Sequence, residues 1–105
     1  MVHEISAVEL KRRLDAGELT RFYDVRTAGE YEVASIEGAQ LVDAALAAQI
    51  EALPRATPLV FHGHHGIRSR SAAHHFEAMG FEEVYNLSGG IEEWSTTVDP
   101  KVPRY

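Results

Sequence analysis

The chain has 105 residues, 45% of them hydrophobic, which is the size of one domain with a single core. Its formal net charge of −6 argues against nucleic acid or an anionic membrane as the main partner, since both favour a basic surface. The absence of cysteine excludes disulfides, thiolate metal ligands and a sulfur nucleophile.

The first part of the chain predicts a helix followed by a strand. Ser6 and Glu9 have the spacing of a capping box, in which each side chain satisfies a free backbone donor of the first helical turn. We therefore expect a helix over residues 7–16, ending at Gly17. The aromatic and β-branched run 21–25 is typical of a strand.

The middle of the chain predicts two more helices around a short strand. Thr27 can cap a short helix that runs through residues 30–33. A strand is expected over 39–42. Asp43 can then cap a helix over 44–53, whose apolar residues recur on one face.

The second half begins with the apolar run 58–62, which suits a central strand buried on both faces. A helix over about 69–79, a strand over 83–87, a short last helix over 89–94 and an extended tail over 95–105 follow. Strands separated by helices predict an α/β fold with a small, mostly parallel central sheet and helices on both faces.

The segment 63–69 has features of an anion site. It follows a buried strand, and in an open α/β sheet ligands bind beyond the carboxyl ends of the strands. The free amides and the dipole of a helix start attract anions. Gly66 lets the chain curl, and Arg68 adds a cation whose donors suit sulfate, phosphate or a thiosulfonate. An ordinary strand-to-helix turn, with Arg68 in a surface salt bridge, fits the same residues.

Four segments of the chain resemble motifs of the rhodanese domain, a sulfurtransferase family. The family's active-site loop has the form Cys-x-x-Gly-x-Arg-Ser, and every fixed position except the first is matched here. The corresponding residues here are Gly63, His64, His65, Gly66, Ile67, Arg68 and Ser69, with Gly63 at the position of the family's cysteine. The other three segments are 24–26 with 30–31, then 36–39, and finally 86–94. The resemblance covers most of the chain and implies one rhodanese-like domain over residues 1–105.

The resemblance implies a sulfurtransferase whose carrier residue is missing. In the family the loop cysteine takes a sulfane sulfur, holds it as a persulfide and passes it to cyanide or a protein thiol. Gly63 has no side chain that could do this, so we expect a domain that is inactive as written but keeps an anion-binding loop over 64–69. Natural loss and replacement of an active enzyme's cysteine both fit Gly63. The alternative is an interaction module that docks a sulfur carrier or a redox partner.

Five histidines lie in or near this segment and raise the question of a metal site. Imidazole binds zinc, copper and nickel, but the spacing is not that of a metal motif and no nearby carboxylate or cysteine completes a ligand set. We expect loop and surface histidines, no metal and no cofactor. His64 or His65 could chemically replace the nucleophile or base, but these positions more simply shape the loop mouth. The five are His62, His64, His65, His74 and His75.

Three charged residues near the first predicted strand are expected to support the loop. Arg26 and Glu30, four positions apart, have the spacing of a helix-surface pair, and we assign them a structural role together with Asp24. Trp94 is expected to anchor the core.

The sequence also indicates partners and location. The expected ligand is a small sulfur-containing anion, and the tail 98–105 resembles the ending of rhodanese domains fused behind glutaredoxin-like or adenylyltransferase domains. A protein sulfur acceptor or such a fused domain is the expected partner. The longest apolar runs are far below the ~20 residues of a membrane span, and residues 1–4 do not resemble a secretory signal. We therefore expect a cytoplasmic domain without a membrane or nucleic-acid partner.

Overall fold

A parallel five-stranded sheet forms the centre of the computed structural model, which describes all 105 residues. The strand order is β1-β5-β4-β2-β3, and every neighbouring pair is parallel. The α/β class and the parallel sheet expected from the sequence are confirmed. The elements are β1 (Val2–Ile5), α1 (Ala7–Asp15), β2 (Phe22–Asp24), α2 (Ala28–Val33), β3 (Gln40–Leu41), α3 (Ala44–Glu51), β4 (Leu59–His62), α4 (Ile67–Ala78), β5 (Val84–Leu87) and α5 (Gly90–Thr97).

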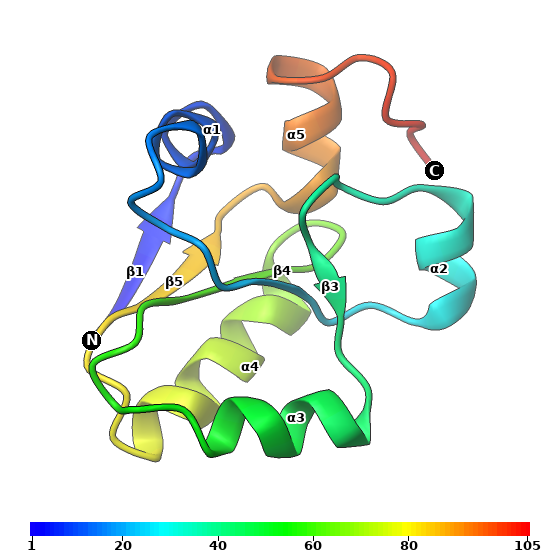
Figure 1. The fold of residues 1–105 in the computed structure, drawn as a ribbon. Helices are drawn as coiled ribbons and strands as arrows, with labels where there is room; N and C mark the ends of the chain where they lie inside the picture. Colours follow the sequence, from blue (N-terminus) through cyan, green and yellow to red (C-terminus); the bar gives the residue numbers. More distant parts are fainter.

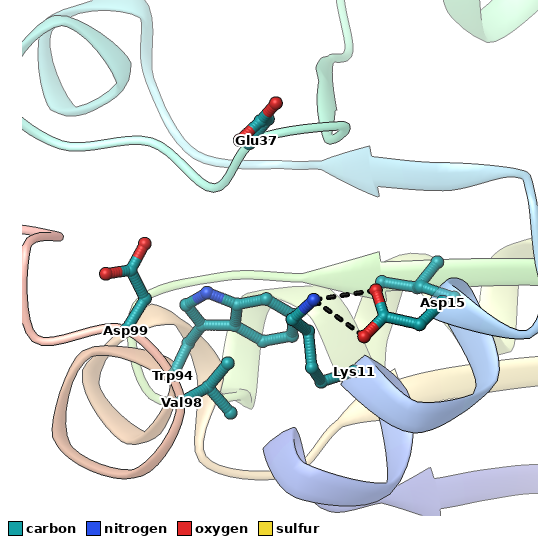
Figure 2. A pocket seen from close by; sticks show the side chains of 7 residues that line it. Lys11, Asp15, Glu37, Trp94, Val98 and Asp99 are labelled. Carbon is teal, nitrogen blue, oxygen red and sulfur yellow. Dashed lines mark hydrogen bonds and ion pairs between the residues drawn. The ribbon is translucent and has the colours of Figure 1, made fainter.

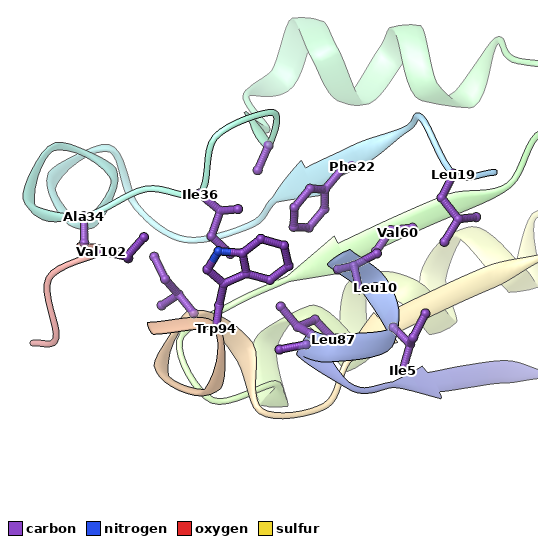
Figure 3. Packing of buried hydrophobic residues seen from close by; sticks show 13 residues of the cluster. Ile5, Leu10, Leu19, Phe22, Ala34, Ile36, Val60, Leu87, Trp94 and Val102 are labelled. Atoms are coloured by element: carbon purple, nitrogen blue, oxygen red, sulfur yellow. The ribbon is translucent and has the colours of Figure 1, made fainter. Parts of the chain in front are cut away.

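The helices divide between the two faces of the sheet, with α1 and α5 on one side and α3 and α4 on the other (Figure 1). All four residues of β4 are buried, as the continuous apolar run predicts. Val60 packs with Leu10 and Trp94 on the first face (Figure 3). Leu59 and Phe61 pack on the second face, because side chains alternate along a strand. Trp94, 5% exposed, is the core anchor that the sequence predicts.

Two helix starts differ from the expected capping. Ser6 accepts a hydrogen bond from the backbone N–H of Glu9, but the Glu9 carboxylate turns to Arg12 instead of returning to the cap. The complete capping box lies at α2, where Thr27 and Glu30 each satisfy the other's backbone N–H. Glu30 is therefore held in place at the start of α2.

The ends of the chain depart most from the sequence prediction. Strand β1 was not predicted, because residues 2–5 are too short to show a periodic pattern, and pairing with β5 stabilises it. Helix α5 runs to Thr97, so the extended tail does not begin at residue 95. The Ser95 hydroxyl donates to the carbonyl of Val102 (2.6 Å). Val102 is 7% exposed and belongs to the core. The tail is thus packed against the body of the domain. No helix has the length and apolar character to cross a bilayer.

Candidate functional site

The 63–69 segment lies at the carboxyl end of the central strand β4 and forms the entry to α4. Its helix starts at Ile67, two residues earlier than expected, with Gly66 as N-cap. Gly66 has φ +97°, and a β-carbon there would lie 2.2 Å from the carbonyl oxygen of Ser88. Only glycine fits this position, because both the backbone conformation and the close approach of the Ser88 backbone exclude a side chain.

The N-terminus of α5 binds the first two residues of the segment. The backbone N–H of Ile91 donates to the carbonyl of Gly63 (2.9 Å), and that of Glu92 donates to the carbonyl of His64 (3.2 Å). Gly90, with φ +60°, allows the start of α5 to approach the backbone of His64 closely. A β-carbon at Gly90 would lie 2.3 Å from the His64 carbonyl oxygen. The carbonyls at the start of the segment therefore face α5.

Asn86, a buried residue of β5, holds the segment through side-chain hydrogen bonds. Its side-chain NH₂ donates to the carbonyl of Gly66 (3.1 Å) and to Glu4 (2.9 Å), and its oxygen accepts from the hydroxyl of Ser69 (2.5 Å). One side chain thus fixes both the N-cap and the first turn of α4.

The backbone donors of the segment are left without partners. None of the N–H groups from His64 to Ser69 donates to a protein acceptor, whereas carbonyls in the same stretch are bonded to α5 and Asn86. The arrangement adds the positive end of the twelve-residue helix α4 to a row of free amides. It can therefore accept an anion.

Position 63 differs from its glycine neighbours because nothing there requires glycine. Gly63 does not have a positive φ, and a β-carbon built on it lies 3.5 Å from the Ser69 amide nitrogen and 3.6 Å from the Ser69 hydroxyl oxygen. These are ordinary van der Waals distances. A side chain at this position would start beside the first turn of α4, where the free amides are.

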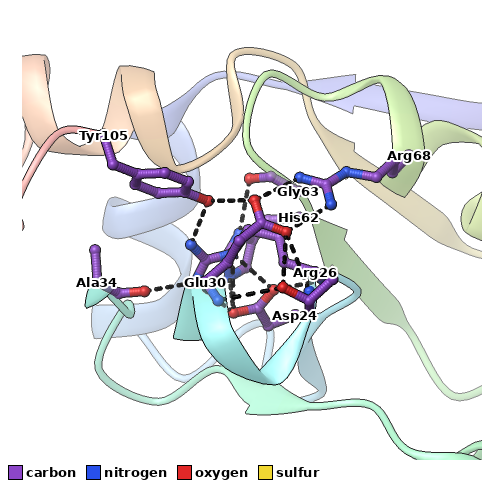
Figure 4. A network of polar contacts seen from close by, with 9 residues as sticks. Asp24, Arg26, Glu30, Ala34, His62, Gly63, Arg68 and Tyr105 are labelled. Carbon is purple, nitrogen blue, oxygen red and sulfur yellow. Dashed lines mark hydrogen bonds and ion pairs between the residues drawn. The ribbon is translucent and has the colours of Figure 1, made fainter. Parts of the chain in front are cut away.

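Two ion pairs lie beside the segment (Figure 4). Arg26 binds the carboxylate of Asp24 through Nε and Nη2, and both side chains are fully buried. Arg68 reaches across to α2 and binds Glu30 through both terminal nitrogens, at 2.7 and 2.8 Å. The expected pairing of Arg26 with Glu30 is therefore wrong, because each of these residues has a closer partner of opposite charge.

Tyr105 joins the two ion pairs and was missed by the sequence analysis. Its hydroxyl donates to Glu30 (2.8 Å) and accepts a hydrogen bond from Arg26 (2.6 Å). Its ring stacks on His64, with the centroids 4.0 Å apart and the planes at 12°. No local pattern marks Tyr105, since its contacts depend on where the packed tail places it.

The five histidines occupy separate environments. No group of three or more His, Asp or Glu side chains is arranged to hold a metal ion. His64 and His65 stack on each other at 4.0 Å, and burial together with His65 lowers the pKa of His64. His62 is fully buried, its Nε2 has no hydrogen-bond partner, and burial lowers its pKa to about 4. His62 is therefore neutral near pH 7.

The largest cavity does not include the segment. It measures about 460 Å³, opens between α1, α5 and the chain near Glu37, and contains the Lys11–Asp15 ion pair (Figure 2). Its lining residues are Lys11, Leu14, Asp15, Glu37, Trp94, Val98 and Asp99. The free amides of the 63–69 segment and this cavity are thus separate features.

Most of the chain matches one known protein family. The family model of the rhodanese-like domain matches residues 6–97. The chain belongs to the rhodanese-like family. The resemblance read from the four sequence motifs is thereby confirmed.

Curated relatives of this rhodanese-like chain are sulfurtransferases. It is 38% identical over 80 residues to the thiosulfate sulfurtransferase GlpE of Pseudomonas fluorescens, which covers 75% of this chain and 73% of the relative. It is 32% identical over 104 residues to the probable adenylyltransferase/sulfurtransferase MoeZ of Mycobacterium tuberculosis. That match covers 96% of this chain but only 26% of the relative, so the chain spans about a quarter of MoeZ.

Solved rhodanese-like structures share the fold. A rhodanese-like domain protein from Staphylococcus aureus has a TM-score of 0.77 at 23% identity, with 98% of each chain covered. The CoADR-RHD structure from Bacillus anthracis has a TM-score of 0.79 at 22% identity, covering 96% of this chain and 18% of that one. At these identities the comparison concerns the fold alone.

Proposed function

We propose that this chain is a rhodanese sulfurtransferase domain that is inactive as written, because Gly63 occupies the position of the nucleophile, and that residues 64–69 bind a small sulfur-containing anion. The observation that carries the proposal is the geometry at position 63. A β-carbon fits there without a clash and points to the Ser69 amide, while Gly66 three residues later excludes any side chain. The backbone around position 63 is therefore compatible with a residue that has a side chain.

The free amides explain how the segment would stabilise sulfur charge. A thiolate or persulfide at position 63 would lie beside unpartnered N–H groups and the N-terminus of α4. Such surroundings lower the pKa of a thiol and favour its anionic form. Without the sulfur, the same donors remain available to a free anion.

A cysteine at position 63 would complete the family's two-step reaction. Its thiolate attacks the outer sulfur of thiosulfate, the S–S bond breaks, and sulfite leaves with the bonding electrons. Cyanide then attacks the terminal sulfur of the persulfide, which releases thiocyanate and restores the thiolate. The chain as written has no group to carry the sulfur between the two steps.

The deciding experiment compares the chain as written with Gly63→Cys and Gly63→Ala. We expect no thiosulfate-to-cyanide transfer above the uncatalysed rate for the first and third proteins. Gly63→Cys should raise the rate of thiocyanate formation by ~10³-fold or more, the size of effect seen when a covalent nucleophile is present or absent. Gly63→Ala controls for the added β-carbon alone.

Two results would contradict the proposal. Turnover by the chain as written would require a nucleophile other than residue 63. A folded Gly63→Cys protein that forms no persulfide, as judged by a mass increase of one sulfur atom after thiosulfate treatment, would mean that the surrounding segment does not activate a thiol.

A second function, docking of a sulfur carrier or redox partner, is favoured by the exposed rim of the segment. Ile67 is 72% exposed at the first position of α4, and Tyr105 flanks the same mouth. The MoeZ match favours a fused adenylyltransferase domain as the neighbour. A titration with thiosulfate and sulfate, followed by the amide NMR resonances of residues 66–69, separates the two functions. A pure docking module would show no shift of these resonances that depends on salt.

A further inference from the structure

The cavity between α1 and α5 has an excess of negative charge. One lysine and three carboxylates line it, so its formal charge is −2. Lys11 binds both oxygens of Asp15, at 2.6 and 2.7 Å, and these two charges cancel. Glu37 and Asp99 form no ion pair, and the one hydrogen bond to the Asp99 carboxylate comes from the backbone N–H of Lys101 (3.0 Å). Two carboxylates therefore remain for a cation that enters the cavity.

Both of these carboxylates extend from turns that are fixed by the rest of the domain. Glu37 lies in a turn closed by a hydrogen bond from the N–H of Ala39 to the carbonyl of Ile36 (3.1 Å), and both of these neighbours are buried. Asp99 follows α5, and its backbone N–H donates to the carbonyl of Trp94 (2.9 Å). The cavity is thus formed before a ligand arrives, which reduces the entropy lost on binding.

Trp94 adds an unused hydrogen-bond donor to the same cavity. Its side chain is 5% exposed, and its indole N–H donates to no protein acceptor. This nitrogen is not sealed from solvent as the unpartnered ring nitrogens of His62 and His64 are. It lies on the edge of the ring that faces the chain carrying Glu37 (Figure 2). Because buried polar groups are normally paired, an unpaired donor at the wall of a cavity indicates a ligand that supplies an acceptor.

Apolar side chains complete the lining. Leu14 of α1 and Val98 at the end of α5 are partly buried against the core and line the cavity together with Trp94. The cavity measures about 460 Å³. Small-molecule sites typically measure ~300–1,000 Å³ and combine apolar walls with a few polar groups that orient the ligand. The size and the lining of this cavity both agree with such a site.

We propose that this cavity binds a small organic cation, an ammonium group on an apolar body that also carries a carbonyl oxygen. Glu37 and Asp99 attract the ammonium group. The Trp94 indole donates to the carbonyl oxygen, and the apolar body packs on Leu14 and Val98. The site goes beyond the proposed sulfur chemistry and does not depend on it, since no residue of the 63–69 segment lines the cavity.

The test uses aromatic probes that differ from one another in a single group. 4-(Aminomethyl)benzamide has the ammonium group, the ring and the carbonyl oxygen. Benzylamine lacks the carbonyl oxygen, and 4-methylbenzamide lacks the ammonium group. Trp94 is the only tryptophan of the chain, so a single indole N–H resonance in NMR spectra and the tryptophan fluorescence both report on this cavity.

Of the probes, 4-(aminomethyl)benzamide should bind most tightly. Loss of the carbonyl oxygen should weaken binding roughly fivefold, the effect of one hydrogen bond. Loss of the ammonium group should weaken it roughly tenfold at low ionic strength. The indole proton resonance of Trp94 should move downfield with the two amides but not with benzylamine, because only the amides supply an acceptor.

Isosteric substitutions test the two carboxylates. Glu37→Gln and Asp99→Asn should each weaken 4-(aminomethyl)benzamide binding roughly threefold, and both together roughly tenfold, whereas 4-methylbenzamide should bind as before. Asp99→Asn keeps the side-chain oxygen that accepts from Lys101, so the turn is retained. Glu82→Gln is the matched control, since Glu82 is also exposed and without an ion pair but lies between α4 and β5.

Three results would overturn the proposal. If no probe moves the Trp94 indole resonance, the cavity is not a binding site. Equal affinity for 4-(aminomethyl)benzamide and 4-methylbenzamide would disprove the preference for a cation. Unchanged binding by the folded double variant would show that Glu37 and Asp99 do not attract the ligand. None of these results bears on the proposed function, whose tests follow residue 63 and the amides of the neighbouring segment.

Discussion

Two glycines of the same segment have opposite backbone requirements. Gly66 has a positive φ and a neighbouring carbonyl where its β-carbon would be, whereas Gly63 has neither. The first is glycine because of the fold, and the second is compatible with any small side chain. This contrast at the scale of single residues separates a glycine that the backbone requires from one that it does not require.

The contrast predicts opposite effects of adding one methyl group. Gly66→Ala should lower the free energy of unfolding by ~2 kcal/mol or more, because the methyl group collides with the Ser88 carbonyl and the left-handed backbone is strained. Gly63→Ala should stay within ~1 kcal/mol of the parent and can be slightly stabilising, since alanine restricts the unfolded chain. Urea denaturation of the three proteins measures both effects. Equal losses from the two substitutions would refute the geometric distinction.

The shape of the segment depends on elements that follow it in the chain. Strand β5 supplies Asn86, which bonds to Gly66 and Ser69, and α5 supplies the amides that bind the first carbonyls. The free N–H groups of the segment are thus a consequence of how β5 and α5 pack beside β4. At the scale of elements, the candidate site is an assembly of three neighbours rather than a self-contained loop.

Replacing Asn86 should therefore loosen the segment. Asn86→Ala leaves the Ser69 hydroxyl and the Gly66 carbonyl without their partners in a buried place, at a cost of ~2–3 kcal/mol in stability. Hydrogen exchange of the amides from residue 67 to 70 should become faster than in the parent. Gln40→Ala, which removes an exposed amide side chain on β3, is the control. Unchanged exchange in a folded Asn86→Ala protein would mean that α5 alone holds the segment.

His62 lies at the end of the central strand, so its protonation affects the whole molecule. Its pKa is lowered by burial from 6.5 to about 4 in the folded state. Between these values the unfolded chain binds a proton that the folded chain does not, so stability rises with pH from about 4 to 6.5 and is lost as the pH falls. One such group contributes a slope of up to ~1.4 kcal/mol per pH unit.

The expected measurement is the free energy of unfolding between pH 5 and 7.5. The parent should lose stability below about pH 6.5, and His62→Phe should show a shallower slope over the same range. The partly buried His64, whose pKa is also lowered, adds to the slope in both proteins. The range stops at pH 5 because Glu4 and Glu30, whose carboxylates are stabilised in the folded state, lose their charge at lower pH. A slope unaffected by the substitution would show that His62 is not the group responsible.

The sequence predicted the fold well where local patterns exist. The apolar run 58–62, the caps at Thr27 and Asp43, and the glycine at position 66 all have short-range signatures, and the structure has the corresponding elements. Strand β1 has no such signature because it depends on a partner far along the chain. The ion pair of Glu30 with Arg68, separated by 38 residues, likewise could not be read from spacing.

The pairing of β1 with β5 also determines when the candidate site can form. Glu4 and Asn86, which meet through a hydrogen bond, are 82 residues apart, and contacts of such long range are made late because closing a long loop costs chain entropy. During synthesis, residues 63–69 leave the ribosome before Asn86, Gly90 and Tyr105 do. A nascent chain that has reached only α4 therefore lacks the residues of β5 and α5 that hold the segment in shape. Anion binding should begin only after β5 and α5 have folded onto the sheet.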